Sequence, residues 1–484
     1  MGQLRTTVVN AALWSAAGEF FARLVPPLVV AYLVRILPAE DFGVVAAVSI
    51  LIGFCQLFWE YGLARTLVQA DADERTAANV VFWTAMGLAV CAYLVLFISA
   101  GLWGRLFSDE RVTQVVPIAA LQVILTAATA TFTALLQRRL QFRRIFYARL
   151  ANALAAGAAA IGLVHFGFTY GALIGGLLAG SLGQLIVLVI GTGWRPGLAY
   201  DRALARRLWK FSRWSMLTGL LAWFFVWADS LVVGAYLDTA SLGVYSTSMT
   251  LVSLTLGLFV APLLPVLYSA LVRLRESPSA MRSALLRANA VIAFLVAPLC
   301  AIAIVLAGSL SGTVFGPGWD QIDEVLPAVA LASGLSWLAI ANNEAYRASG
   351  RPELETWIML VCVVVYLATY LVAVRFGLKA FAWSRCALAG FGLLLHLVFA
   401  RHFLGLGFSV SAASFGRPAV AAGLTAAAGL FFLNLTGGIG SVAGIVAAAL
   451  ALGLVYFCAL FVLAPNFVRV ELAGLVAERF QRSA

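Results

Sequence analysis

Long apolar segments separated by short polar connections run through the whole chain. Fourteen such segments can be drawn, and most are close to the roughly 20 residues that a helix needs to cross a bilayer core about 30 Å thick. Lipid cannot satisfy open backbone groups, so each segment is predicted to be a helix. The segments are 8–34, 42–64, 79–103, 113–136, 150–168, 171–191, 214–236, 243–270, 288–310, 325–346, 356–374, 380–400, 418–434 and 441–463.

This pattern predicts an all-α polytopic membrane protein. Segments of this length exclude the roughly ten-residue alternating strands of an outer-membrane barrel. Hydrophobic residues make up 63% of the chain and charged residues 11%, which also excludes a soluble domain. The first segment is too long for a cleavable signal peptide and carries Glu19 and Arg23, so it is expected to be the first spanning helix.

Basic residues alternate between the connections. With the N-terminus placed inside, 25 of the 32 Lys and Arg residues fall on inside connections. By the positive-inside rule this bias predicts that both termini are cytoplasmic. The net charge of +11 then reflects arginines that face an anionic inner leaflet, so no nucleic-acid partner is expected. The outside connections hold only Arg35, Arg105, Arg111, Arg375 and Lys379, and Arg23 and Arg385 lie inside segments.

Residues suited to catalysis or cofactor binding are sparse. The six Cys lie in apolar segments, where they act as small apolar side chains, and the three His are scattered. Neither a metal-ligand spacing nor a nucleotide-binding loop is present, so no cofactor is expected. The longest outside connection, 311–324, is too short for a catalytic domain, which disfavours a membrane polysaccharide polymerase or ligase.

The chain partly repeats itself at an offset of 200–210. Asp41-Phe-Gly-Val44 opens the second segment, and Ser241-Leu-Gly-Val244 opens the eighth. An offset of six segments preserves orientation, so the two halves would form a parallel repeat; chance agreement in a chain rich in Gly and Ala is the alternative. The predicted parts are an N-lobe at 1–195, a C-lobe at 196–405, two further helices at 406–464 and a cytoplasmic amphipathic tail at 465–484.

Three ordered stretches resemble a known family. The first runs from Arg35 to Gly43 and leads into a helix that ends Glu60-Tyr-Gly-Leu-Ala64. The others are Asp229-Ser-Leu-Val-Val-Gly234 with Leu242-Gly-Val-Tyr245, and Tyr346-Arg-Ala-Ser-Gly-Arg-Pro352. Together they resemble Wzx-type oligosaccharide flippases, in the WzxC-like branch of the multidrug/oligosaccharidyl-lipid/polysaccharide exporter superfamily.

The resemblance implies a bacterial inner-membrane flippase. Its substrate would be an undecaprenyl-pyrophosphate-linked oligosaccharide, a repeat unit of exopolysaccharide, capsule or the O-antigen of lipopolysaccharide. The implied fold is V-shaped, with two six-helix lobes around a central cavity, and works by alternating access. Besides membrane lipids, a polysaccharide polymerase and chain-length proteins are candidate partners.

Charges inside the membrane are functional candidates by default, because lipid-facing placement is costly. Glu19 and Arg23 are four residues apart, hence on one helix face. Arg23 would meet the lipid pyrophosphate, since its planar fork binds phosphate oxygens in pairs. Glu19 would orient Arg23 or couple to a proton. The alternative is a self-neutralising pair that only holds the helix in place.

Arg385 and Asp229 form a second candidate set. Arg385 would also contact pyrophosphate, or would extend to the periplasmic interface. Asp229 would be an ion-coupling site or a counter-charge for Arg385, with a helix-cap or inter-lobe contact as the alternative.

Two glutamates and two tryptophans complete the candidates. Glu60 and Glu344 lie near cytoplasmic segment ends and would form a gate, or would simply pair with Arg65 and Arg347. The candidates for stacking on sugar rings, with plain packing as the alternative, are Trp223 and Trp227.

The nearest functional alternatives lie in the same superfamily: a peptidoglycan-precursor flippase and a cation-coupled drug exporter. Of the six charges inside segments, four are acidic and two basic, which leaves a cationic drug as a possible substrate. A non-transporting scaffold is disfavoured by these charges, because charged side chains inside a membrane are costly and a scaffold would not require them.

Overall fold

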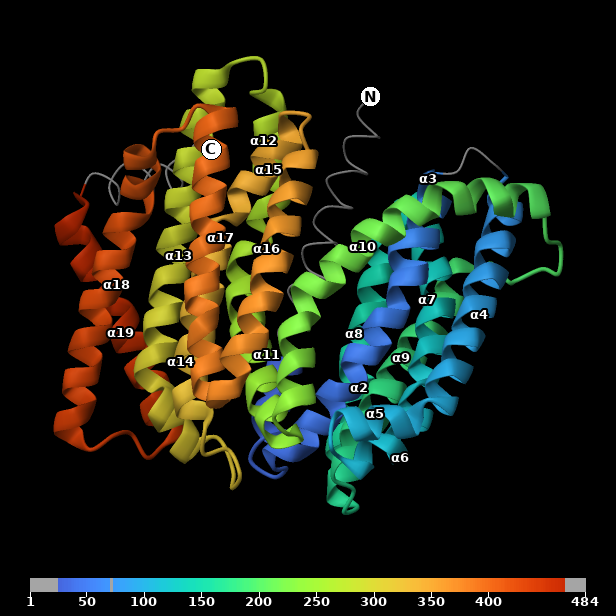
Figure 1. Cartoon of the computed structure of the whole chain (residues 1–484), viewed down its shortest axis with the longest axis horizontal. Coiled ribbons are helices and arrows are strands. Elements are labelled where there is room, and N and C mark those ends of the chain that lie inside the picture. The colour runs from blue at the N-terminus through green and yellow to red at the C-terminus, as the bar shows by residue number, and fades with distance from the viewer. Residues whose placement is uncertain (1–24, 70–72, 466–484) are drawn as a thin grey trace, which may run out of the picture. The chain divides into compact units, whose positions relative to one another are not determined.

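The computed structural model describes residues 25–69 and 73–465, and every regular element in these ranges is a helix (Figure 1). Twelve helical stretches of the described residues are long and apolar enough to cross a membrane. The prediction of an all-α polytopic membrane protein is therefore confirmed. The predicted segment 8–34 lies mostly outside the described residues, and the count of fourteen stays a prediction.

One of the twelve stretches contains two predicted segments. Glu353–Leu404 is 52 residues long, roughly 80 Å at the rise of an α-helix and far more than one crossing requires. A 3-10 turn at Val374–Phe376 interrupts it, and Gly377 follows with a φ of +86°. Only glycine adopts that conformation without a steric penalty, so the stretch becomes two helices.

Contacts between helices divide the chain into two units. Unit 1 extends to Thr247 and includes Met359–Leu378, and the rest forms unit 2. Unit 1 contains α2 (Ala39–Leu57), the π-helix η1 (Phe58–Ala64), α3 (Arg65–Gln69), α4 (Glu74–Ile98), α5 (Ala100–Leu106), α6 (Glu110–Ala119), α7 (Leu121–Arg138), α8 (Phe142–His165), α9 (Tyr170–Thr192), α10 (Arg202–Tyr236), the start of α11 (Thr239–Val260) and most of α16 (Glu353–Ala373) with η2 (Val374–Phe376).

Unit 2 contains the remainder of α11 and seven further helices of the described residues. These are α12 (Leu263–Arg273), α13 (Pro278–Thr313), α14 (Ile322–Leu338), α15 (Ile340–Ala348), α17 (Gly377–Leu404), α18 (Phe408–Thr436) and α19 (Val442–Leu463). The units differ in extent from the predicted lobes, because α10 and the start of α11 pack with unit 1. The lobe boundaries at residues 195 and 405 stay a prediction.

The outer surface of the helices is apolar, as a lipid solvent requires. Large aliphatic side chains such as Ile98, Ile190 and Leu450 are 82%, 77% and 72% exposed. In water such a surface would aggregate, whereas in a bilayer it is solvated by acyl chains. Lipid removes the hydrophobic drive for helix association, so close packing of small residues must hold the helices together.

The α8–α9 pair illustrates this packing. A Cβ atom added at Gly176 would lie 2.9 Å from the carbonyl oxygen of Ala156, and one at Gly180 would lie 3.0 Å from that of Asn152. The two backbones therefore touch directly over successive turns. The Asn152 amide also donates to Gln184 across the pair, at 3.0 Å.

The crossing of α2 and α11 is closer and has a reciprocal geometry. A Cβ added at Gly43 would lie 1.7 Å from the carbonyl oxygen of Thr239, and one at Gly243 would lie 1.8 Å from that of Ala39. Each glycine thus packs on the residue four positions before the other. The same offset of 200 residues relates 39 to 239 and 43 to 243. The crossing is therefore locally two-fold symmetric and supports the internal repeat inferred from the sequence.

The Gly43 contact predicts that adding one methyl group at this position strongly lowers the stability of the protein. We expect Gly43→Ala to destabilise the protein by about 1–3 kcal/mol or more, since a backbone carbonyl cannot move aside as a side chain can. The measurement is the thermal unfolding midpoint of purified protein in detergent. Gly87→Ala in α4 is the matched control, because nothing lies within 4 Å of its added Cβ. Equal midpoints for the two variants would contradict the close crossing.

Candidate functional site

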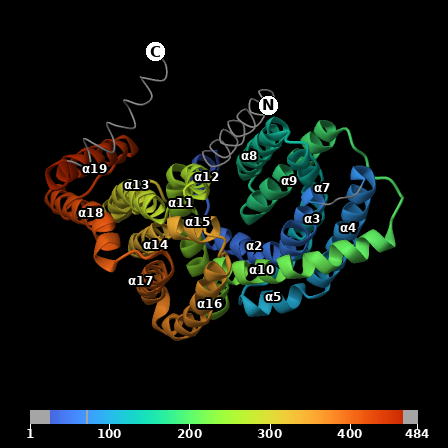
Figure 2. The same ribbon diagram turned by 90° about the horizontal axis from the view of Figure 1, so that it is seen from above.

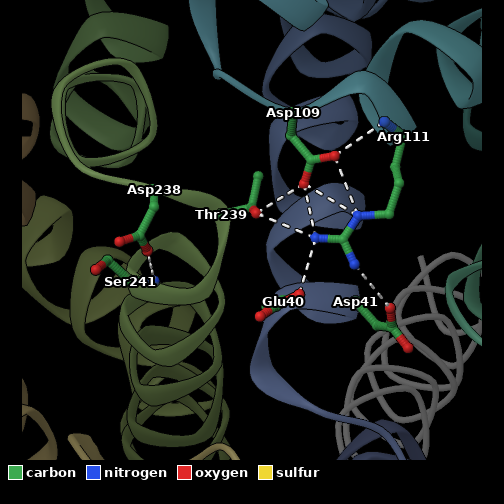
Figure 3. Close-up of polar contacts among 7 residues, drawn as sticks. All are labelled: Glu40, Asp41, Asp109, Arg111, Asp238, Thr239 and Ser241. Carbon is green, nitrogen blue, oxygen red and sulfur yellow. Dashed lines mark hydrogen bonds and ion pairs between the residues drawn. The ribbon is translucent and has the colours of Figure 1, made fainter.

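The candidate site is the junction of α2, α6, α10 and α11 in unit 1. An arginine network closes one end of it (Figure 3). Arg111, in the first turn of α6, lies with its guanidinium 2.8 Å from the Asp109 carboxylate and 3.1 Å from that of Glu40. A third carboxylate, Asp41, lies 3.6 Å away and is buried. One guanidinium thus joins the starts of α2 and α6.

The start of α11 enters the same network. The Thr239 hydroxyl donates to Asp109 at 2.8 Å, and Arg111 donates to that hydroxyl at 3.5 Å. Burial alone would raise the pKa of Asp109, but hydrogen bonds from Arg111 and Thr239 outweigh it and hold the pKa below its ordinary value. The network therefore favours ionised Asp109 and ties three helix starts together next to the glycine crossing, since Thr239 belongs to both.

Sequence reasoning did not find this network. Arg111 was placed only among the outside basic residues, and Glu40 and Asp109 were not singled out. The available signal was the run Asp109-Glu110-Arg111 at a segment start, but the other contributors come from connections about 70 and 130 residues away. The predicted topology assigns this end to the periplasmic side.

A buried polar pair lies beyond the crossing. Asp229 on α10 is 2% exposed and accepts a hydrogen bond of 2.8 Å from the hydroxyl of Tyr245 on α11. The Ser230 amide donates to its other oxygen at 2.6 Å. Tyr245 lies two residues after Gly243 and is fully buried. The structure thus places the predicted Asp229 at the junction and adds Tyr245 as a partner.

Trp223 lies in an aromatic cluster on the same helix. It is 8% exposed, and its ring meets that of Phe54 edge-on, with centroids 5.2 Å apart. Trp227, one turn further, packs on Gly53 of α2. These contacts are packing contacts, and stacking of either ring on a sugar stays a prediction.

An apolar groove opens beside Trp223, between α2, α4 and α10. Its volume is about 570 Å³, within the range of small-molecule sites. The lining is aliphatic and aromatic, with Phe54, Phe58, Cys91 and Val95 among its residues. Such walls suit a hydrocarbon chain and offer few partners to sugar hydroxyls.

Among the other predicted residues, some belong to unit 2 and some fall outside the described ranges. Glu19 and Arg23 fall outside the described residues. Arg385 is partly buried on α17, in unit 2, whereas Asp229 belongs to unit 1, so their pairing stays a prediction. Within the described ranges, no cluster of three or more His, Cys, Asp or Glu side chains could hold a metal ion.

The two predicted gate glutamates differ from each other. Glu344 is buried and pairs with Arg347 at 3.3 Å, as one reading of the sequence predicts. Arg347 also binds Glu355 at 2.6 Å, which fastens α15 to the start of α16. The Glu60 side chain is exposed on the π-helix η1, and the side chain of its predicted partner Arg65 lies outside the described structure. A gating role for either stays a prediction.

Comparison with known proteins agrees with this architecture. Residues 32–324 match the family of polysaccharide biosynthesis proteins. The succinoglycan biosynthesis transport protein ExoT of Rhizobium meliloti (strain 1021) is 24% identical over 331 residues, which cover 68% of this chain and 66% of that protein. An uncharacterised membrane protein in the cps region of Klebsiella pneumoniae is 21% identical over 75% of this chain and 76% of its own length.

Solved structures show the same fold. The lipid II flippase MurJ, in an inward closed conformation, matches with a TM-score of 0.74 and 14% identity, over 95% of this chain and 99% of MurJ. An inward-facing multidrug resistance transporter of the MATE family matches with a TM-score of 0.60 and 11% identity, over 82% of this chain and 94% of its own.

The family match covers more than half of the chain, and the fold agrees with it. The chain therefore belongs to the polysaccharide biosynthesis protein family of membrane transporters, as its resemblance to Wzx-type flippases predicts.

Proposed function

We propose that this protein flips undecaprenyl-pyrophosphate-linked oligosaccharide repeat units from the cytoplasmic to the periplasmic face of a bacterial inner membrane. The product would be used to build an exopolysaccharide, capsule or O-antigen. Membership of a polysaccharide biosynthesis family carries this proposal. A relative named for succinoglycan transport supports the substrate class.

The anionic headgroup requires cationic partners at membrane depth. Arg23 and Arg385 are the proposed pyrophosphate contacts, since a guanidinium can bind two phosphate oxygens in a fixed geometry. Glu19 and Asp229 are the proposed coupling or counter-charge groups. The hydrogen bond from Tyr245 would hold the Asp229 carboxylate in one orientation. A change in the charge of Asp229 would therefore directly strengthen or weaken the α10–α11 contact.

The proposed transport cycle requires one end of the molecule to be sealed while the other is open. The α2–α11 crossing and the Arg111 network supply such a seal, since both join helices from the two halves of the inferred repeat. Opening at this end would break charged contacts that surround one arginine, and closure would restore them.

The sidedness of the lipid-linked intermediate tests the proposal. In cells depleted of this protein, we expect the intermediate to accumulate intact and to stay inaccessible to a periplasmic lectin or glycosidase, with polymer lost. Re-expression of the protein should restore both access and polymer. An intermediate that is accessible without the protein would contradict flipping, and drug-efflux assays would follow.

Arg23→Ala tests the proposed headgroup contact. We expect it to reduce polymer output at least tenfold at normal protein abundance, because a phosphate contact is lost. Arg105→Ala is the control, since Arg105 is exposed and lies on a predicted outside connection. The measurement is secreted or surface polymer per unit of membrane-inserted protein. Normal output from the Arg23 variant would remove Arg23 from the site.

The lowered pKa of Asp109 predicts a pH dependence of stability. A carboxyl group whose folded pKa is depressed contributes stability above its unfolded pKa, about 3.9, and loses it as the pH falls through the lower folded value. We expect the unfolding midpoint of the wild-type protein to fall below about pH 4, and Asp109→Asn to remove part of this fall. The exposed Asp320→Asn should keep the wild-type profile. Identical profiles for all three proteins would exclude a stabilising role for the network.

A further inference from the structure

The first half of α10 carries a cationic stripe that the proposed transport function does not use. The stripe consists of Arg202, Arg206, Trp209 and Arg213. The last three lie four, seven and eleven residues after Arg202, which places all four on one helix face. All four side chains are exposed, Trp209 by 44%. Acidic side chains are absent from the stripe.

The opposite face of the same half-helix is packed. Leu204, Leu208 and Ser212 follow at four-residue steps and are 6%, 7% and 0% exposed. Asp201 caps the helix and accepts from the amides of Ala203 and Leu204 at 2.8 and 3.0 Å. The half-helix is therefore held on unit 1 by one face and presents its arginines on the other.

The position of this half-helix matches the boundary of a membrane. At 35 residues α10 is about 50 Å long, more than one crossing, and only Ser215–Tyr236 qualifies as a span. Residues 202–214 run across the other helices of unit 1, near the ends of α3 and α4 (Figures 1 and 2). A helix that crosses the spans at their ends lies close to the interfacial plane.

Neighbouring residues share this amphipathic character. Leu198 and Tyr200, in the connection before α10, are 89% and 44% exposed. Large apolar and aromatic side chains among arginines are typical of helices that lie at the headgroup level, where rings and acyl carbons meet phosphates.

Arg202 and Arg206 also differ from a structural arginine nearby. Arg139 is bound to the Glu74 carboxylate and to the carbonyl oxygen of Thr192. By contrast, none of the ion pairs made by the described residues involves Arg202 or Arg206. Their charges are available to an anionic partner.

We propose that the first half of α10 is a binding surface for anionic phospholipid, with Arg202, Arg206 and Arg213 on lipid phosphates and Trp209 between them at the interface. Phosphate groups on neighbouring lipids match a row of guanidinium groups in charge and in hydrogen-bonding geometry. This surface lies on the helix that carries Asp229, and it does not depend on which substrate is transported.

The test uses purified full-length protein in detergent, titrated with dioleoyl-phosphatidylglycerol or dioleoyl-phosphatidylcholine. A lipid that binds the folded state raises the unfolding midpoint. We expect phosphatidylglycerol to raise the midpoint of the wild-type protein more than phosphatidylcholine, and Arg202→Gln/Arg206→Gln to lose at least half of that difference. Added salt should shrink the difference as well, because it screens the charges.

Two further double variants keep the test specific. Arg202→Lys/Arg206→Lys preserves the charge and should retain most of the phosphatidylglycerol effect. Arg105→Gln/Arg375→Gln removes the same charge from exposed positions elsewhere and should respond as the wild type does. A full response in the Arg202→Gln/Arg206→Gln protein would overturn the proposal. A wild-type protein whose unfolding midpoint responds equally to the two lipids would overturn it too. An acidic protein would then be the remaining partner for the stripe.

Discussion

Direct contact between two helix backbones is the constraint on which the rest of unit 1 depends. At the α2–α11 crossing there is no room for even a methyl group, because each glycine lies against a carbonyl of the other helix. Backbone atoms do not change rotamer, so this contact fixes the separation of the two helices. In lipid, where apolar side chains gain nothing by leaving their solvent, such close approach is one of the few available sources of helix association.

Hydrogen-bonded polar groups lie on both sides of this crossing and join further helices to it. On one side of the crossing, Arg111 and Thr239 join carboxylates from α2 and α6. On the other side, Asp229 and Tyr245 join α10 to α11. Hydrogen bonds of this kind, charged in the Arg111 network, are costly to leave half made in a low-dielectric surrounding. The junction is therefore suited to two discrete arrangements, intact or open, which is what the proposed alternating access requires.

The sequence predicted an all-helical membrane protein because the thickness of the bilayer sets the length of each apolar segment that spans it. The repeat placed Gly43 and Gly243 at equivalent positions, but the sequence did not predict that they meet, because an offset carries no information on contact. The Arg111 network was missed because its members come from three connections, and proximity between them is a property of packing. Asp229 was identified by its charge, whereas Tyr245 stood only as part of a stretch that resembles the family, and nothing in the sequence marked it as the partner of Asp229. For Trp223 the sequence left sugar stacking and plain packing open, because depth in a segment does not separate the two; the structure surrounds it with rings and an apolar groove.

The π-helix η1 has a consequence for how the span from Ala39 to Val68 tolerates changes in length. Its wider turns hold an additional residue compared with an α-helix. Deleting one residue elsewhere in this span would rotate all that follows by about 100° and turn buried faces toward lipid. A deletion within Phe58–Ala64 can instead be absorbed by tightening the wide turns to α-helix, which leaves both the Gly43 crossing and α3 in register. The π-helix is thus a place in this span where the chain can lose a residue without losing its fold.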